Sequence, residues 1–168
     1  PMGCAGVTTF NAVRNAGVPV GGRVAVFGIG GLGHLAVQFA ANMGYEVVAI
    51  ARGPEREALA LQLGATRYIN SAAQAPGAAL RDMGGADLII STASTTAPLA
   101  ELLDGLRVHG RLTLLGVDDG HVDVPAASLV MRAQTVCGHL TGSPADIEDA
   151  MRFAVQHDVR PVAERMPL

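Results

Sequence analysis

A glycine-rich turn between a strand-like run and a helical segment constrains the fold of this chain more than any other sequence feature. Residues 23–28 form a short apolar run with β-branched side chains, which is typical of a buried strand. Residues 34–43 carry apolar side chains at helical spacing, and Gly44 then provides a helix stop. The turn between the two reads Gly28-Ile-Gly-Gly-Leu-Gly33, a GxGxxG pattern. A strand, a glycine-rich turn and a helix in this order open a βαβ unit, and this context gives the pattern its weight.

The three glycines of the pattern have different predicted roles. Gly28 permits the tight turn, Gly30 lets a pyrophosphate approach the backbone, and Gly33 lets the helix pack closely against the strand. The start of the helix presents unpaired amides and a partial positive charge to the phosphates. The predicted phosphate-binding residues of a dinucleotide site are Gly28, Ile29, Gly30, Gly31, Leu32 and Gly33. The alternative is a glycine-rich turn that binds no ligand.

Strand-like and helix-like segments alternate along the rest of the chain. Further strands are predicted at 46–51, 67–69, 86–92, 111–116 and 136–140, and further helices at 54–64, 98–106 and 143–156. Alanines favour a helix at 71–83 while Pro76 and Gly77 interrupt it, and 116–127 is typical of a surface loop. The serial order predicts an α/β fold, a Rossmann-type doubly wound parallel sheet of about six strands with helices on both faces.

Composition excludes several classes of protein. Hydrophobic residues make up 49% of the 168 residues and charged residues 16%, which is unlike a disordered chain. All 12 basic residues are arginine, so the chain has no lysine for a GxxxxGK[ST] phosphate loop or a Schiff base. The Tyr-x-x-x-Lys catalytic pair of short-chain dehydrogenases is excluded for the same reason. The net charge of -3 predicts no nucleic-acid partner.

Targeting and covalent features also narrow the interpretation. Cys4 and Cys137 do not make a disulfide framework. No apolar run reaches the roughly 18 residues that a membrane span needs, and no signal peptide is visible, so we predict a cytoplasmic location without a membrane partner. The chain begins at Pro1 without an initiator methionine, and we expect it to be a domain excised from a longer protein.

The residue that follows the second predicted strand bears on the choice of cofactor. Folds that bind NAD place an Asp or Glu about 20 residues beyond the glycine-rich turn, where it accepts the ribose hydroxyls. Here Ala51 stands at that place, Arg52 follows, and Arg56 lies one helical turn later. A guanidinium attracts a 2′-phosphate, so Ala51 and Arg52 predict NADP in preference to NAD. The alternative is that Arg52 is merely exposed and that Glu55 or Glu57 binds the ribose of NAD.

Four segments occur together in this chain: Cys-Ala-Gly-Val-Thr-Thr-Phe at 4–10, Gly-Ile-Gly-Gly-Leu-Gly-His at 28–34, Leu-Gly-Ala at 63–65 and Gly-Arg-Leu at 110–112. In combination they resemble the medium-chain zinc-dependent alcohol dehydrogenases. The resemblance covers essentially the whole chain, but only the cofactor domain of that family. It implies that residues 1–168 are a single dinucleotide-binding domain and that an N-terminal, GroES-like zinc domain belongs to the same longer enzyme.

The resemblance also implies roles for individual residues. Cys4 matches a ligand of the catalytic zinc, and Thr8 matches a threonine beside the nicotinamide. Residues after the fourth and fifth strands would line the nicotinamide pocket, namely Thr92, Leu115 and Val117. Residues 138–142 would face the carboxamide. The chain offers no convincing second and third zinc ligand, so zinc is expected in the full-length enzyme only.

The resemblance predicts hydride transfer between NADP, or alternatively NAD, and an alcohol, aldehyde or ketone. The chain by itself is expected to bind cofactor but to be inactive, since the missing catalytic domain supplies the other zinc ligands. Its family tends to form dimers or tetramers, so a homo-oligomer is expected. The alternatives are a zinc-free quinone or enoyl reductase of the same superfamily and a non-catalytic dinucleotide-binding module.

Two further signals are given no catalytic role. The aspartates and His121 within 118–123 are interpreted as a solvated loop rather than a metal cluster. His34, directly after the glycine-rich turn, is positioned to touch either the cofactor or a neighbouring loop, while His109, His139 and His157 are interpreted as structural.

Overall fold

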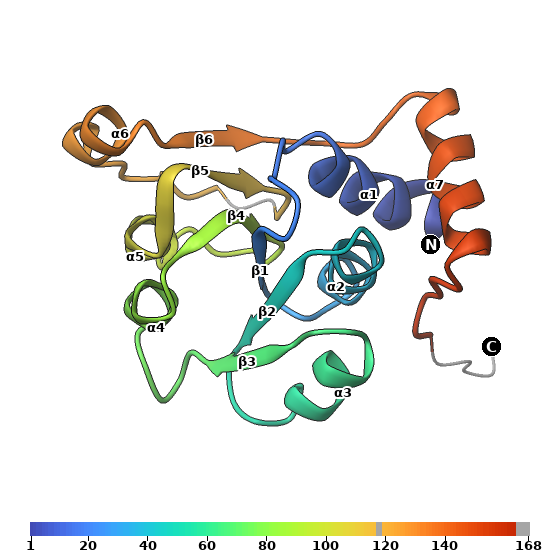
Figure 1. The fold of residues 1–168 in the computed structure, drawn as a ribbon, viewed down its shortest axis with the longest axis horizontal. Coiled ribbons are helices and arrows are strands. Elements are labelled where there is room, and N and C mark those ends of the chain that lie inside the picture. Colours follow the sequence, from blue (N-terminus) through green and yellow to red (C-terminus); the bar gives the residue numbers. More distant parts are fainter. Residues whose placement is uncertain (117–118, 164–168) are drawn as a thin grey trace.

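The computed structural model describes residues 1–116 and 119–163, and it contains one six-stranded sheet in the order β3-β2-β1-β4-β5-β6 (Figure 1). The strands are β1 (Arg23–Phe27), β2 (Glu46–Ala51), β3 (Arg67–Asn70), β4 (Ala86–Ser91), β5 (Leu106–Leu114) and β6 (Thr135–Gly138). Every neighbouring pair is parallel. The predicted doubly wound parallel sheet is therefore confirmed.

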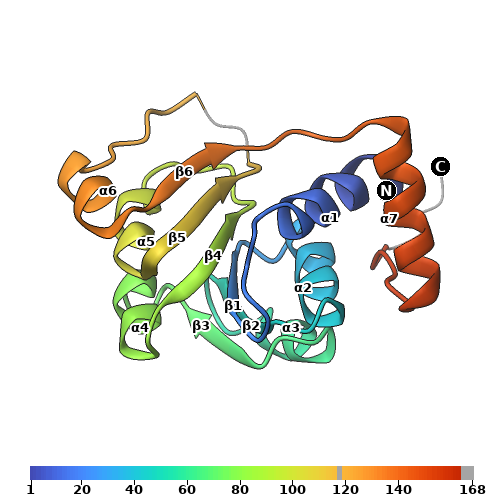
Figure 2. The same ribbon diagram turned by 45° about the horizontal axis from the view of Figure 1, so that its top comes forward.

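Helices cover both faces of this sheet (Figures 1 and 2). The helical elements of the described residues are the π-helical turn η1 (Met2–Gly6), α1 (Val7–Arg14), α2 (Gly33–Asn42), α3 (Glu57–Gln62), α4 (Pro76–Asp82), α5 (Leu99–Asp104), α6 (Ala126–Arg132) and α7 (Pro144–Gln156). None of the helices in the described ranges is long and apolar enough to cross a membrane.

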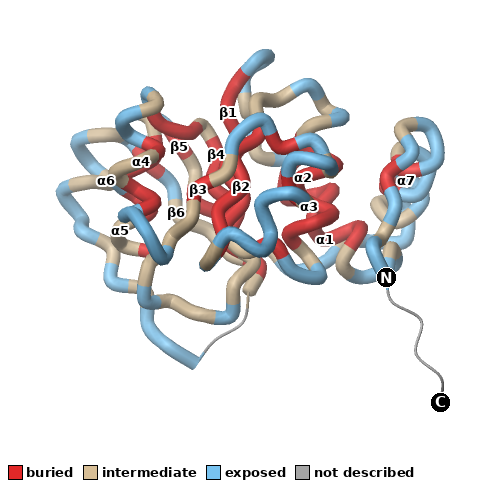
Figure 3. Tube along the Cα trace, turned by 90° about the horizontal axis from the view of Figure 1, so that it is seen from below, coloured by how far each residue is buried: buried red, intermediate tan, exposed pale blue. Residues whose placement is uncertain are grey.

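Alternation along β1 divides the core between the two faces. Val24 and Val26 pack into one cluster with residues of α2 and α3, whereas Ala25 and Phe27 pack into a second cluster with residues of α4 and α5. All five residues of β1 are buried, as Figure 3 shows for the centre of the sheet. A strand that is apolar on both faces requires helices on both sides, which is why the sequence pattern specified this architecture.

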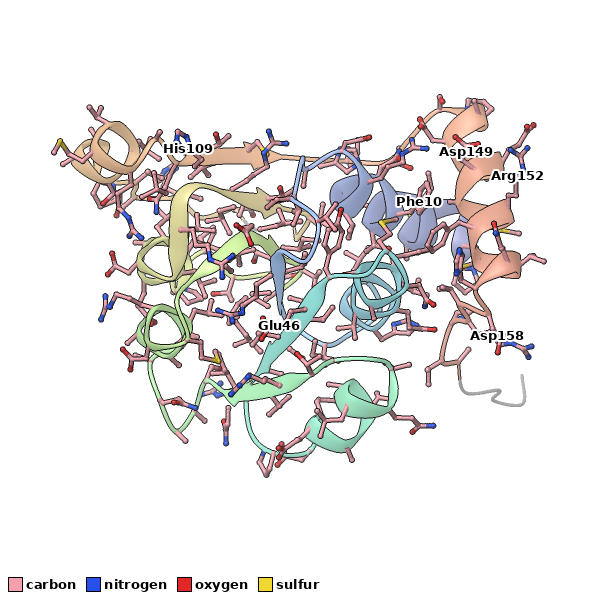
Figure 4. The ribbon with its side chains drawn as sticks, in the orientation of Figure 1. Phe10, Glu46, His109, Asp149, Arg152 and Asp158 are labelled. Atoms are coloured by element: carbon pink, nitrogen blue, oxygen red, sulfur yellow. The ribbon has the colours of Figure 1, made fainter. Side chains whose placement is uncertain are left out.

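A third cluster attaches α7 to the domain. The ring centroids of Phe10 in α1 and Phe39 in α2 lie 5.3 Å apart, and those of Phe10 and Phe153 in α7 lie 5.5 Å apart. Figure 4 shows Phe10 between α1 and α7. Ser143 and Asp146 form a capping box at the start of α7, within the helix predicted at 143–156. The long connection from β6 therefore ends in a helix that packs on α1 rather than on the sheet (Figure 2).

Three segments differ from the sequence-based expectation. The ambiguous stretch 71–83 contains α4, because Pro76 stands in the first turn, where its missing N–H is not needed. The fifth strand begins at Leu106 rather than at 111, since it pairs with β4 on both sides of an irregularity in register. The expected loop 116–127 ends in α6, a helix without a buried residue.

Candidate functional site

The glycine-rich turn opens into a cleft at the carboxyl end of the sheet. The cleft has a volume of about 630 Å³, and its lining includes the turn, the residues after β4 and the N-terminal segment. Those lining residues are Pro1, Cys4, Ala5, Gly28, Gly30, Gly31, Leu32, Thr92 and Ala93. Strand β1 pairs with β2 on one side and β4 on the other, so the cleft lies where the order of strands reverses. Parallel α/β sheets bind ligands at this switch point.

Two of the glycines serve the packing of the turn. Gly28 has a φ of 93°, in the left-handed region that favours glycine. A Cβ on Gly33 would lie 1.8 Å from the backbone oxygen of Gly28, so α2 approaches β1 closely, as predicted. The hydroxyl of Thr92 donates to the same oxygen at 2.7 Å. Thr92 therefore lines the cleft and also holds the turn.

The next two glycines leave space at the cleft. A Cβ on Gly30 or on Gly31 would meet nothing within 4 Å. The amides of Gly31, Leu32 and Gly33 donate to no acceptor within residues 1–116 and 119–163. They stand at the N-terminus of α2, where the helix dipole is positive. Open space beside unpaired amides fits a phosphate group.

His34 makes two hydrogen bonds that tie this turn to a distant segment. Its Nδ1 lies 2.8 Å from the backbone oxygen of Gly30, and the amide of Val162 donates to its Nε2 at 3.0 Å. A second hollow of about 190 Å³ is lined in part by Gly30, Gly31, His34, Arg56 and Val162. The sequence placed His34 correctly beside the turn but gave no signal for Val162.

The segment after β2 carries two arginines, Arg52 and Arg56. Ala51 is buried, whereas Arg52 and Arg56 are exposed. Neither arginine takes part in an ion pair among the described residues. Arg56, and not Arg52, lines the hollow beside the glycine-rich turn. The carboxylate of Glu55 folds back over Gly53, so an acidic group also lies near this strand end.

Two side chains of β3 hold the backbone of that segment. Asn70 accepts from the amide of Gly53 at 2.9 Å, and the hydroxyl of Tyr68 donates to the carbonyl of Gly53 at 2.7 Å. Burial raises the pKa of Tyr68, and the carboxylates of Glu55 and Glu57 raise it further. Both hydrogen bonds join the segment after β2 to β3, and neither was predicted from the sequence.

Of the two residues predicted in the N-terminal segment, Cys4 lines the cleft and Thr8 does not. Cys4 is exposed and lines the cleft, while Thr8 is buried and its hydroxyl donates to the backbone oxygen of Cys4 at 2.8 Å. No group of three or more His, Cys, Asp or Glu side chains able to hold a metal occurs in the parts of the chain that the structure describes. Cys4 thus offers one thiolate, and these residues do not complete a zinc site.

The remaining predicted residues lie deeper or outside the described ranges. Leu115 is buried in the core, and its amide donates to the oxygen of Ser91 at 2.8 Å. It is not among the residues that line the cleft. Val117 lies outside the described residues, as does Asp118 of the loop interpreted as solvated.

The fold and the cleft together define a class of protein, an α/β domain with a glycine-rich phosphate loop at the switch point of a parallel sheet. The model of the zinc-binding dehydrogenase family matches residues 31–156. The chain belongs to this family, and it covers the cofactor-binding half of the medium-chain alcohol dehydrogenases.

Individual relatives agree with this assignment. The alcohol dehydrogenase notN of Aspergillus sp. (strain MF297-2) is 45% identical over 168 residues, which are 100% of this chain and 49% of the relative. The NADP-dependent alcohol dehydrogenase C 1 of Mycolicibacterium smegmatis is 34% identical over 98% of this chain and 46% of the relative. The crystal structure of the alcohol dehydrogenase from Aeropyrum pernix superposes with a TM-score of 0.87, at 28% identity, over 95% of this chain and 48% of that one. The chain spans about half the length of the curated relatives it matches.

Proposed function

We propose that this chain is the cofactor-binding domain of an NAD(P)-dependent alcohol dehydrogenase that interconverts an alcohol with an aldehyde or ketone. The observation that carries the proposal is the open space at Gly30 and Gly31 beside three amides at the start of α2 that have no acceptor among residues 1–116 and 119–163. A bound nicotinamide supplies the hydride acceptor or donor. The residues of this chain bind the cofactor and orient it across the cleft.

The phosphates would bind at the glycine-rich turn. The amides of Gly31, Leu32 and Gly33 would donate to the pyrophosphate, since they have no competing acceptor in the described part of the chain. Thr92 would keep Gly28 in the conformation that the turn needs. The ring end of the cofactor would then extend toward Cys4 and Ala93, which line the far part of the same cleft.

The adenosine end would bind at the segment after β2. Arg56 lines the hollow beside the turn and Arg52 precedes it, and neither is neutralised by an ion pair among the described residues. Two exposed guanidinium groups favour a 2′-phosphate and hence NADP. The Mycolicibacterium relative named NADP-dependent supports the same choice. Glu55 at this strand end is the group that would favour NAD instead.

Zinc would require ligands from a further domain. Cys4 would contribute one thiolate, and the hydrogen bond from Thr8 to its backbone would orient it in the cleft. A zinc ion at such a site polarises the substrate oxygen. Because the described residues offer no complete ligand set, the 168-residue chain is expected to bind dinucleotide without oxidising alcohols.

Titration of the purified chain with NADPH and NADH tests this proposal. The chain contains no tryptophan, so the emission of the reduced nicotinamide is observed without transfer from that residue. Saturable binding with NADPH tighter than NADH is the expected result, with no alcohol-dependent NADP reduction. Failure to bind either dinucleotide would refute the proposal. Measurable alcohol oxidation by this chain would refute the part of the proposal that requires zinc ligands from a further domain.

The edge of the sheet suggests how copies of the full enzyme would assemble. Strand β6 pairs with β5 and, within the described residues, with no strand on its other side. Val130 and Met131 of the neighbouring α6 are exposed, as is Leu140 after β6. An unpaired edge flanked by apolar side chains favours pairing with a second copy, so a homo-oligomer is part of the proposal. Light scattering of the chain with Met131→Glu as the disrupting variant tests it.

A further inference from the structure

His34 is buried, and its two ring nitrogens have opposite hydrogen-bonding roles. The amide of Val162 is a donor only, so Nε2 of His34, at 3.0 Å, must be the unprotonated acceptor. The proton of the neutral ring is therefore on Nδ1, which donates to the backbone oxygen of Gly30 at 2.8 Å. The contacts thus assign the Nδ1–H tautomer and join the phosphate loop to the segment after α7.

The hydrogen bond to Gly30 determines where the next amide points. The oxygen of Gly30 accepts from the backbone amide of His34 at 3.1 Å as well as from its ring. In a trans peptide the C=O and the following N–H point in opposite directions, and the described residues include no cis peptide bond. With the oxygen held toward α2, the amide of Gly31 points away from the helix. A peptide between two glycines has little steric preference of its own, so this orientation depends on the hydrogen bonds.

A second side chain of α2 secures the segment that His34 contacts. Gln38 donates from Nε2 to the backbone oxygen of Arg160 at 2.9 Å and accepts from the amide of Arg160 at 3.0 Å. Gln38 and His34 are each only 7% exposed. The segment 160–162 is therefore held at two points one turn of α2 apart, and Val162 lines the hollow beside Gly30.

We propose that His34 is a positioning residue for the dinucleotide pyrophosphate: its Nδ1–H holds the Gly30–Gly31 peptide with the amide of Gly31 toward the phosphates. The segment 160–162 braces the ring from its other side. This inference rests on the proposed function, because it assumes that the glycine-rich turn binds a dinucleotide. A purely structural histidine would affect the stability of the fold and leave the affinity of the folded protein unchanged.

Three substitutions separate the two hydrogen bonds of the ring. In His34→Asn the side-chain amide stands near the position of Nδ1 and retains a donor to Gly30, as Asn42 shows by donating to the oxygen of Gln38 four residues earlier at 2.9 Å. His34→Met keeps a long side chain but has no donor for Gly30, whereas His34→Gln is unsuitable because Gln38 shows that glutamine also donates to the oxygen four residues earlier, at 3.0 Å. His34→Leu removes both hydrogen bonds of the ring. The matched control is Gln38→Leu, which loosens the segment 160–162 without touching Gly30.

The measurement is the affinity of the folded chain for NADPH, compared with adenosine 2′-monophosphate, which lacks the pyrophosphate. The Leu and Met variants should bind NADPH about tenfold more weakly, while the Asn and Gln38→Leu variants should bind within about twofold of the unsubstituted chain. Affinity for adenosine 2′-monophosphate should not change in any of them. Circular dichroism confirms that each variant is folded at the temperature used, and if His34→Leu is unfolded, the comparison of Asn with Met decides.

Two results would overturn the inference. One is equal NADPH affinity in the Asn and Met variants, since the hydrogen bond to Gly30 would then have no effect on binding. The other is a parallel loss of adenosine 2′-monophosphate binding, which would indicate general disturbance of the site. Failure of the unsubstituted chain to bind NADPH and NADH is a different outcome, because it refutes the proposed function itself.

Discussion

Replacing Gly33 with alanine tests whether close packing of α2 against β1 limits this position to glycine. The added Cβ would lie 1.8 Å from the backbone oxygen of Gly28 and 3.2 Å from the hydroxyl of Thr92. The first of these atoms belongs to the backbone and cannot rotate away. The start of α2 would therefore have to move by about 1 Å, which disturbs the hydrogen bond from Thr92 to Gly28 as well.

The expected cost follows from this overlap. Forcing an additional methyl group into a packed site costs typically about 1–3 kcal/mol, and contact with backbone places Gly33→Ala at about 3 kcal/mol. For a protein of this size a loss of about 1 kcal/mol lowers Tm by roughly 2–4 °C, so a decrease of roughly 6–12 °C is expected. Thermal and urea unfolding followed by circular dichroism measure the change in the free energy of unfolding.

Gly30→Ala is the matched control in the same turn. Its Cβ would meet nothing within 4 Å, and Gly30 is not among the residues with positive φ. The free energy of unfolding should be unchanged or greater by up to about 1 kcal/mol, because alanine reduces the freedom of the unfolded chain. The same methyl group would occupy the space proposed for the pyrophosphate, so NADPH affinity should fall at least about tenfold.

The two variants together can refute the reasoning. An unchanged Tm in Gly33→Ala would show that the contact with Gly28 does not limit the distance between α2 and β1. Unchanged NADPH affinity in Gly30→Ala would show that the open space beside this residue is not where the phosphates bind. Gly33→Ala should lose stability, whereas Gly30→Ala should lose NADPH affinity alone.

Three further outcomes are expected. Arg56→Ala should weaken NADPH binding about tenfold in a fluorescence titration and leave NADH binding unchanged, and equal losses for both would contradict a 2′-phosphate contact. Hydrogen bonds from Ser143, and the nearby Arg14, lower the pKa of Asp146 from 3.8 to about 2, so its stabilisation is complete above 3.8 and is lost as the pH falls through about 2. Asp146→Asn should therefore flatten the decrease in Tm between these pH values, and an unchanged profile would refute the assignment. Cys4→Ser should leave Tm and NADPH affinity unchanged because the thiol is exposed, and a loss of either would show a role beyond metal binding.

Local sequence patterns were sufficient for the central elements of the fold. Strands β1 and β2 are buried apolar runs, and α7 lies within its predicted range, 143–156. The glycine-rich turn was located correctly because short-range geometry requires glycine there. Gly28 has a positive φ, and Gly33 lies close to the preceding backbone.

Two helices gave no usable signal, for opposite reasons. Helix α1 is buried along Val7–Val13, including three polar residues, so its sequence lacks the alternation of apolar and polar faces. Helix α6 buries no residue and ends at Ala133 in the left-handed region, where glycine is the usual residue. Both helices depend on what surrounds them rather than on their own pattern.

The candidate site likewise combines features that the sequence located with features that only the structure located. The sequence by itself determined the parallel sheet, the position of the phosphate loop and the absence of an acidic residue directly after β2. Each of these features depends on residues that are close together in the sequence. Only the tertiary structure decided that Arg56 rather than Arg52 lines the hollow beside the loop, and that Val162 donates to His34 across 128 positions of the chain. Hydrogen bonds between distant segments depend on how helices pack on the sheet, and no local pattern encodes that packing.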